Sequence, residues 1–392
     1  GSATLTGKRL ASSTPIALPC NDRQGLLTRG AVYSRAVTSE VPAGIKYDNV
    51  SRFFAEHVPG GNVPLSFSLI SGGRSNLTYK VMGGDQTWVL RRPPLGHVLP
   101  TAHDMAREFK VLSGLAKASF PAPTPIAFCA DAEVNDYPFY VMDYREGVII
   151  AEAIPRGYAT TDAERQAMAS ALVRTLVELH AIDYETVGLG DFGRPEGYLE
   201  RQVRRWSEQW ARSETRPMPE IDEVIRRLRN SIPKSPKPTI VHGDYRLGNM
   251  MLAPDDPGRV VAVLDWEMAT LGDPLSDLGY TLSYWQQADD SPEVVMARGV
   301  NGVTAAPGFP SRKELVAEYA RLSGRDVSMI EWYEIFASYK LAVIVEGIHA
   351  RFLAGETVGA GFEGYGQRAE ALVRQALAAT EKAEDAKLRG VA

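Results

Sequence analysis

The 392 residues, 44% of them hydrophobic, are enough for two lobes with cores of their own, and a formal net charge of −5 argues against a nucleic-acid-binding protein. No uninterrupted apolar run reaches the roughly eighteen residues of a membrane-spanning helix. The two cysteines and six histidines show no metal-ligand spacing, which argues against a zinc enzyme. These features indicate a mixed α/β protein of the reducing cytoplasm, with no membrane or nucleic-acid partner.

Residues 1–45 are expected to be a partly ordered N-terminal extension. They are rich in Ser, Thr and small residues without a sustained period, and A-S-S-T-P-I-A-L-P is too broken for the apolar part of a secretory signal. The first clear element follows at Tyr47, where an amphipathic pattern predicts a short helix that runs to His57 and stops before P-G-G.

Three short apolar runs then predict a β-meander. They are L-S-F-S-L-I from Leu65, L-T-Y-K-V after a glycine-containing loop, and T-W-V-L-R-R after a G-G-D turn. The loop contains Gly73, Ser75 and Asn76, whose backbone N–H groups and polar side chains are suited to cover a triphosphate. A plain hairpin turn explains two glycines and a serine equally well.

The third strand ends at Arg91, and a helix is predicted from Ala102 with Glu108 near its apolar face. A cation at the end of a strand and a glutamate on the next helix are the pair that fixes nucleotide phosphates in kinase-like sites. The cation is Arg where Lys is usual, but its fork still suits phosphate oxygens. The alternative is a solvated Arg and a surface Glu.

The strand Y-P-F-Y-V-M-D-Y-R-E-G becomes polar at its end, as expected of a hinge between lobes. The backbone around Asp143 and Arg145 would then read adenine, with Met142 against the plane of the base. An ordinary edge strand with its turn is the alternative. This hinge divides the chain into a nucleotide-binding lobe, residues 46–143, and a helical lobe, residues 144–392.

The second lobe is predicted to be mainly helical. Its helices span residues 164–180, 197–210, 221–230, 313–322, 329–352 and 366–387, and another begins near Asp277. Asp277 is expected to cap that helix or to support the backbone of a neighbouring loop. His180, at the end of the first of these helices, is expected to favour the helix dipole rather than to bind a ligand.

Residues 241–265 carry the chemistry. V-H-G-D-Y-R-L-G-N ends in Asn249, five residues after Asp244, and V-V-A-V-L-D then delivers Asp265 at the end of a strand. Phosphoryl transfer needs one carboxylate to orient a hydroxyl, and an amide with a second carboxylate to hold Mg²⁺ against a nucleotide. Turn residues of a β-hairpin are the alternative, but chance would produce this match on the order of once in ten thousand chains of this length.

Taken in order, these motifs resemble the aminoglycoside phosphotransferase and choline kinase family. H-G-D-Y-R-L-G-N corresponds to its catalytic loop and V-L-D-W-E to its metal-binding aspartate, while W-V-L-R-R-P-P looks closest to the subgroup related to kinase-like domains fused to acyl-CoA dehydrogenases. The resemblance implies an α+β, two-lobed protein-kinase-like fold with a small antiparallel-sheet N-lobe and a larger, mainly helical C-lobe. It implies a base-like Asp244, Mg²⁺ ligands Asn249 and Asp265, and Arg91 in the place of Lys.

The expected function is ATP- and Mg²⁺-dependent transfer of the γ-phosphate to a hydroxyl of a small molecule. A nucleotide-binding pseudokinase that regulates a partner is the alternative, and a protein kinase is disfavoured because no D-F-G to A-P-E segment is present. Aminoglycosides are polycations that call for surplus carboxylates, yet residues 281–392 contain 15 acidic and 12 basic side chains. The sequence therefore does not indicate a dedicated aminoglycoside-resistance enzyme.

Overall fold

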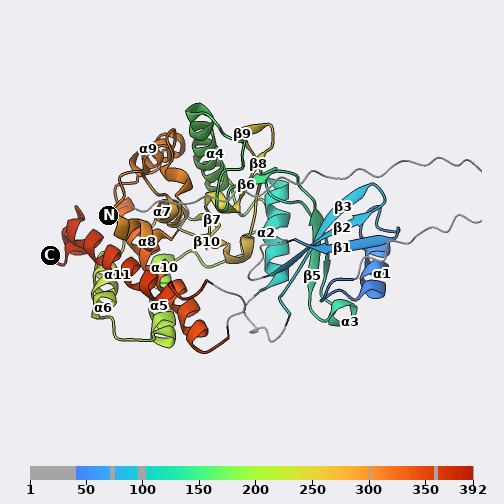
Figure 1. Ribbon diagram of the computed structural model, residues 1–392, viewed down its shortest axis with the longest axis horizontal. Coiled ribbons are helices and arrows are strands. Elements are labelled where there is room, and N and C mark those ends of the chain that lie inside the picture. Colours follow the sequence, from blue (N-terminus) through green and yellow to red (C-terminus); the bar gives the residue numbers. More distant parts are fainter. Residues whose placement is uncertain (1–40, 71–75, 96–102, 300–301, 357–360, 392) are drawn as a thin grey trace, which may run out of the picture. The chain divides into compact units, whose positions relative to one another are not determined.

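The computed structural model describes residues 41–70, 76–95, 103–299, 302–356 and 361–391, all of which lie in the compact unit Val41–Ala392 (Figure 1). The predicted helix 47–57 and the β-meander are both present. The elements of the first lobe are α1 (Tyr47–His57), β1 (Leu65–Leu69), β2 (Leu77–Gly83), β3 (Gln86–Arg92), α2 (Met105–Lys117), β4 (Pro125–Cys129), α3 (Ala132–Asn135) and β5 (Phe139–Asp143).

The strands of this lobe form one antiparallel sheet in the order β1-β2-β3-β5-β4. Successive side chains of a strand point to opposite faces, so Leu90 and Val141 enter the small core with α1. Arg91 lies opposite Tyr140 in the register of β3 and β5. Both therefore point to the other face, which α2 covers.

Helix α2 begins at a capped end and turns a buried stripe toward the sheet. The Asp104 side chain accepts a hydrogen bond from the Arg107 backbone N–H, which satisfies one of the unpaired donors of the first turn. Met105 and Leu112 on this stripe are buried, and Glu108 between them is only 2% exposed. A carboxylate this deeply buried needs partners, and it finds them in the candidate site.

The second lobe contains the predicted helices and several short elements that the sequence did not predict. Its elements are β6 (Val148–Ile149), α4 (Asp162–Ala181), α5 (Tyr198–Ser213), α6 (Pro219–Asn230), β7 (Thr239–Val241), η1 (Leu247–Asn249), β8 (Met250–Ala253), β9 (Asp256–Val263), η2 (Trp266–Met268), β10 (Thr270–Gly272), α7 (Leu275–Tyr284), α8 (Pro292–Arg298), η3 (Val303–Ala305), α9 (Arg312–Ser323), α10 (Ile330–Leu353), α11 (Tyr365–Lys382) and α12 (Ala386–Arg389).

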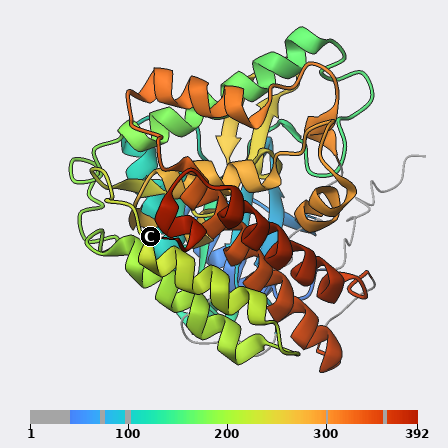
Figure 2. The same ribbon diagram turned by 90° about the vertical axis from the view of Figure 1, so that its left-hand side faces the viewer.

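One predicted helix is wrong in its extent. Residues 366–387 do not form a continuous helix, because the backbone is extended at Ala383 and the Asp385 side chain caps the separate helix α12. Helix α10 packs against α5, α7 and α11, and α11 in turn packs against α6 and α8, as seen where the red and light-green helices meet in Figure 2. No helix among the described residues has the length and apolar character needed to cross a membrane.

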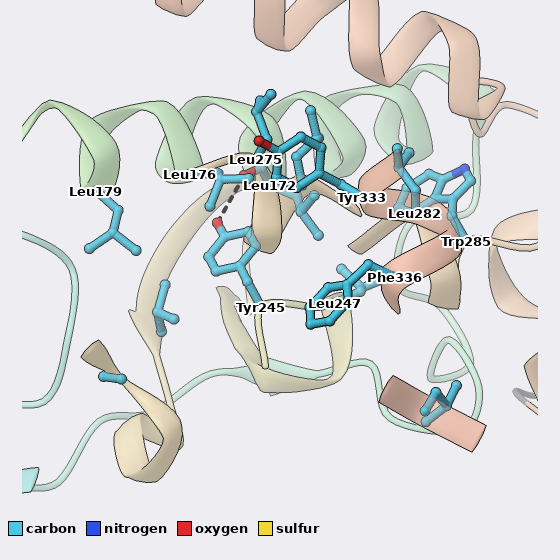
Figure 3. Close-up of a cluster of buried hydrophobic side chains, with 14 of the residues drawn as sticks. Leu172, Leu176, Leu179, Tyr245, Leu247, Leu275, Leu282, Trp285, Tyr333 and Phe336 are labelled. Carbon is cyan, nitrogen blue, oxygen red and sulfur yellow. Dashed lines mark hydrogen bonds between the residues drawn. The ribbon is translucent and has the colours of Figure 1, made fainter. Parts of the chain in front are cut away.

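A buried cluster of side chains fixes the loop that follows β7. Figure 3 shows Tyr245 and Leu247 of this loop among leucines of α4 and α7 and aromatic residues of α10. Tyr245 is 1% exposed, and its hydroxyl donates a 2.8 Å hydrogen bond to the carbonyl of Leu172 in α4. Burying an aromatic side chain and satisfying its hydroxyl together anchor the loop. Asp244 therefore precedes a residue with little freedom to move.

Candidate active site

The carboxylate of Asp277 in α7 binds the backbone of the turn His242-Gly243-Asp244. Asp277 is fully buried; its Oδ2 accepts a 2.7 Å bond from the His242 N–H, and its Oδ1 accepts a 2.8 Å bond from the Gly243 N–H. The N-cap of α7 is Pro274. Of the two roles predicted for Asp277, the structure therefore shows support of a loop and not capping.

Gly243 has a positive φ of +84°, and a Cβ atom at this position would lie 2.7 Å from the Met268 carbonyl oxygen. Only glycine combines this conformation with so close an approach of two backbones. The H-G-D sequence therefore places Asp244 at the end of a turn that other residues would distort.

His180 of α4 completes the support of Asp277. Burial lowers the pKa of His180, which disfavours the charged form that would interact best with the helix dipole. Its Nδ1 lies 2.8 Å from the Tyr319 hydroxyl and its Nε2 lies 3.4 Å from Asp277 Oδ2. Burial alone would raise the pKa of Asp277, but the hydrogen bond from His180 and those from the backbone hold it below its ordinary value.

Asp244 and Asn249 meet directly. Asn249 Nδ2 donates a 2.6 Å bond to Asp244 Oδ2 and a 2.9 Å bond to the Asp244 carbonyl oxygen, across the 3₁₀ turn η1. Asn249 is 7% exposed, whereas the Asp244 side chain is 18% exposed and so remains reachable from solvent. The amide thus fixes the carboxylate without covering it.

The antiparallel pairing of β8 and β9 brings Asp265 to the same place. Met250 pairs with Val263, and the Leu264 N–H donates a 2.8 Å bond to the Asn249 carbonyl oxygen. Asp265 follows with a φ of +68°, a left-handed conformation that non-glycine residues seldom adopt. Strain of this kind, on the order of 1–3 kcal/mol, concentrates at functional sites.

The predicted contact between Arg91 and Glu108 is present. Arg91 Nε lies 2.9 Å from Glu108 Oε2, and Arg91 Nη2 donates a 2.6 Å bond to Asp265 Oδ1. The Tyr140 hydroxyl, on the same face of the sheet, donates a 2.9 Å bond to Glu108 Oε2. Arg91 therefore links the sheet and α2 to the strand end that carries Asp265.

Burial and charge act in opposite directions on this pair. Burial would lower the pKa of Arg91, but Glu108 and the other nearby acids outweigh it, so the guanidinium pKa is raised and the group stays charged. Burial raises the pKa of Glu108 against the opposing effects of Arg91 and Tyr140. The pair is thus a desolvated one whose separation would be costly.

Of the loop residues predicted to cover phosphates, Gly73 and Ser75 lie outside the described residues. Asn76 is 1% exposed, and its Nδ2 donates to Glu108 Oε1 at 3.0 Å and to Glu267 Oε2 at 2.9 Å. Its Oδ1 lies 2.7 Å from His103 Nδ1. Asn76 therefore stands beside the Arg91 ion pairs, with both ends of its amide in use.

The residues predicted to form the hinge, Met142, Asp143 and Arg145, lie at or just after the end of β5 and not among the contacts of Arg91 described above. Asp143 Oδ2 lies 2.7 Å from Arg145 Nη2, its Oδ1 accepts a 2.7 Å bond from the Thr124 N–H, and its own N–H donates to the Thr124 carbonyl oxygen at 3.0 Å. The Asp143 N–H is thus committed to the protein and is not a donor for adenine. Met142 is 8% exposed and packs in the larger core.

Two cations near Asp244 were missed from the sequence. Arg246 Nε lies 3.3 Å from Asp244 Oδ1, and Lys340 Nζ of α10 donates a 2.7 Å bond to the Gly243 carbonyl oxygen. The signal for Arg246 was its place two residues after the aspartate of the motif. The signal for Lys340 was a single lysine inside the apolar run I-F-A-S-Y-K-L-A-V-I-V.

The sequence of the chain is similar to that of a curated protein. Acyl-CoA dehydrogenase family member 11 of Rattus norvegicus is 34% identical over 328 residues, which are 81% of this chain and 41% of that protein. The chain therefore spans less than half the length of this curated relative.

Solved structures show the same fold. A crystal structure from Ralstonia eutropha JMP134, provisionally described as an aminoglycoside phosphotransferase, has 33% identity and a TM-score of 0.75, and the match covers 86% of this chain and 99% of that one. Choline kinase of Cryptosporidium parvum Iowa II has a TM-score of 0.58 at 12% identity over 88% and 97% of the two chains, a likeness of fold alone. The model of the phosphotransferase enzyme family matches residues 66–315. The chain belongs to the phosphotransferase enzyme family and has the two-lobed, kinase-like fold of its structural neighbours.

Proposed function

We propose that the protein transfers the γ-phosphoryl group of ATP to a hydroxyl of a small molecule. The observation that carries this proposal is the convergence of three segments on one place. Asn249 bonds to Asp244 at 2.6 Å, and Arg91 of the sheet lobe bonds to Asp265 at 2.6 Å. A carboxylate to orient the acceptor, an amide and a second carboxylate to hold Mg²⁺, and a cation for the phosphates are the groups that kinase sites use.

Asp244 would orient the acceptor. Its partly exposed carboxylate would accept a hydrogen bond from the attacking hydroxyl and take the proton as the phosphorus–oxygen bond forms. Asn249 and the turn at Gly243 hold that carboxylate in one orientation, so that positioning supplies a large part of the rate enhancement.

The donor set around Asp265 fits Mg²⁺. Asn249 Nδ2 donates hydrogen bonds to two oxygens of Asp244. The amide oxygen therefore points away from Asp244 and is left for a cation. No group of three or more His, Cys, Asp or Glu side chains suited to a metal occurs among the described residues, but Mg²⁺ at nucleotide sites needs only one or two protein ligands beside phosphate oxygens. Asn249 and Asp265 would hold it. When bound, Mg²⁺ neutralises charge on the phosphates and on the leaving group.

Arg91 would contribute its remaining donors to the nucleotide phosphates. Its Nε lies 2.9 Å from Glu108 Oε2 and its Nη2 donates to Asp265, so the guanidinium is held between two carboxylates before a phosphate arrives. A fork held in this way binds phosphate oxygens with little loss of side-chain entropy.

The acceptor is proposed to be a hydroxylated acid or acyl thioester rather than an aminoglycoside. The support is the 34% identity to a protein named as an acyl-CoA dehydrogenase family member. Hydroxyacyl-CoA compounds are therefore the first acceptors to test, beside hydroxy acids and aminoglycosides as the comparison.

Two measurements test the proposal. Mg·ATP should raise the melting temperature of the wild type, and Asp265→Asn should remove most of that shift. Asp244→Asn should keep the shift but lose acceptor-dependent ADP release by about a hundredfold or more.

The outcomes separate the enzyme from its alternative, a nucleotide-binding regulatory protein whose support is Arg at position 91. A nucleotide-dependent shift without ADP release from any acceptor would favour the regulator. No shift with any nucleotide and metal would refute both, and undiminished turnover by Asp244→Asn would refute the role of Asp244.

A further inference from the structure

Arg246 is a cation beside Asp244 to which the proposed mechanism gives no role. Its Nε lies 3.3 and 3.4 Å from the two Asp244 carboxylate oxygens. A guanidinium has five N–H donors, and neither terminal nitrogen of Arg246 has a hydrogen-bond partner among the residues that the structure describes. The side chain is 31% exposed. Four donors in a planar fork, the geometry that matches a carboxylate or phosphate, therefore stay open to a ligand.

This fork borders a small cavity of about 50 Å³. A water molecule needs roughly 10–15 Å³ of such space, so the cavity has room for a small polar group such as a carboxylate or phosphate. The Tyr284 ring, 5.2 Å from the guanidinium carbon, forms one wall. Gly248 forms another, and a Cβ atom there would lie 2.5 Å from Arg246 Nη1, so glycine leaves the fork its space.

The cavity is formed by the helical lobe. Its lining comes from residues 150–151, 246–248 and 303–304 and from Tyr284, and none of it comes from the sheet lobe that holds Arg91 and Glu108. No Asp or Glu of the part of the chain that the structure describes lines it. The nucleotide phosphates are assigned above to Arg91 and Asp265, so the Arg246 fork is left for the acceptor that Asp244 would orient.

We propose that Arg246 binds an anionic group of the acceptor, a carboxylate or a phosphate, while Asp244 orients the acceptor hydroxyl. This inference rests on the proposed function and narrows its substrate class. The fork would add charge-assisted hydrogen bonds to an acid and would repel an aminoglycoside, which brings several positive charges.

The test measures binding, so it does not depend on turnover. Saturating Mg·AMP-PNP fills the nucleotide site, and the melting temperature is then followed against glycerate, glycerol 3-phosphate, glycerol and 3-amino-1,2-propanediol. These four probes share a backbone and differ in charge. At least one of the two anions should stabilise the wild type while the neutral and cationic probes do not, and the stronger of the two anions identifies carboxylate or phosphate as the preferred group.

Arg246→Gln should weaken the binding of that anion at least tenfold. Arg259→Gln, at an exposed arginine paired with Asp255 on the β8–β9 hairpin, is the matched control and should bind as the wild type does. Equal binding of the anion by Arg246→Gln, or equal binding of glycerol and the anions by the wild type, would overturn the proposal. So would the absence of any anion effect.

The failure of this inference and the failure of the proposed function look different. If Mg·AMP-PNP stabilises the wild type but the anions do not, the role of Arg246 is refuted and the proposed function is not. If Arg246→Gln removes the shift caused by Mg·AMP-PNP itself, the fork binds the nucleotide and the inference is wrong. If the wild type shows no nucleotide shift, the proposed function fails first.

Discussion

Lys340 offers a test of how charge is held beneath the catalytic turn. It is 8% exposed, its ammonium donates to the Gly243 carbonyl oxygen at 2.7 Å, and it lies 4.1 Å from the centre of the Tyr280 ring. Burial lowers its pKa from 10.5 to about 8, although Asp244 and Asp277 oppose that effect and only Arg205 adds to it. A lysine with this pKa destabilises the folded state whenever it is charged.

The magnitude follows from the shift. Each pKa unit corresponds to about 1.4 kcal/mol, so a fall from 10.5 to about 8 means that the charged form costs about 3 kcal/mol relative to the neutral amine. Below pH 8 the lysine is protonated in both folded and unfolded states, and the cost is constant. Between pH 8 and 10.5 the unfolded state binds more protons, so the free energy of unfolding of the wild type rises with pH.

Lys340→Met removes this dependence, because methionine has a similar length and no charge. At pH 7 the variant should be as stable as the wild type or up to about 2 kcal/mol more stable, since the relief of a buried charge exceeds the lost bond to Gly243. From pH 8 to pH 10 the difference should move by about 2 kcal/mol in favour of the wild type. Phosphoryl transfer should slow about tenfold, because the turn at Gly243 loses a contact that positions Asp244.

Urea unfolding at pH 7, 8, 9 and 10 provides the measurement, with Lys313→Met, an exposed lysine of α9, as the control that should show no such trend. Other titrating groups cancel in the difference between wild type and variant at each pH. A difference that stays constant within about 0.5 kcal/mol across this range would refute the reasoning. A loss of more than about 3 kcal/mol at pH 7 would show that the bond to Gly243 dominates instead.

Three further substitutions probe the supports of the site. Asp277→Asn should lower the free energy of unfolding by about 3 kcal/mol in urea, since its NH₂ cannot accept from one of the two backbone N–H groups; a loss under about 1 kcal/mol would contradict this. Arg91→Lys should weaken Mg·ATP binding about tenfold by calorimetry, because one ammonium cannot pair with Glu108 and Asp265 as the fork does; unchanged affinity would count against the bridge. Tyr140→Phe should cost about 1–2 kcal/mol by removing one donor to Glu108, and a thermal scan at constant pH that shows no change would exclude that bond.

The strand and helix periodicity of the sequence predicted those contacts of the site that form between elements close together in the chain. Arg91 ends a strand and Glu108 lies on the buried stripe of the next helix, so the two periods place them on facing surfaces. Asn249 and Asp265 are joined by a short hairpin, and their proximity follows from antiparallel pairing alone. These contacts depend on few residues between the partners.

Long-range supports were predicted less completely. Asp277 reaches back to Gly243 across 34 residues, and support of a loop was one of the two roles predicted for it. Lys340 reaches the same turn across 97 residues and was not predicted, because nothing in the local pattern says that α10 packs against this loop. The sequence shows that one lysine is buried in an apolar helix, but only the tertiary packing shows which carbonyl group it meets.

The acidic groups around Arg91 explain why an arginine suits this site. One guanidinium faces Glu108 and Asp265 at 2.9 and 2.6 Å and Glu267 at 3.8 Å. A lysine ammonium is a single point charge, whereas the fork contacts two carboxylates with separate nitrogens and keeps its plane fixed. Three carboxyl groups thus lie around this one guanidinium. Mg²⁺ prefers oxygen ligands, so the same acids that hold Arg91 would also favour a divalent cation beside Asp265.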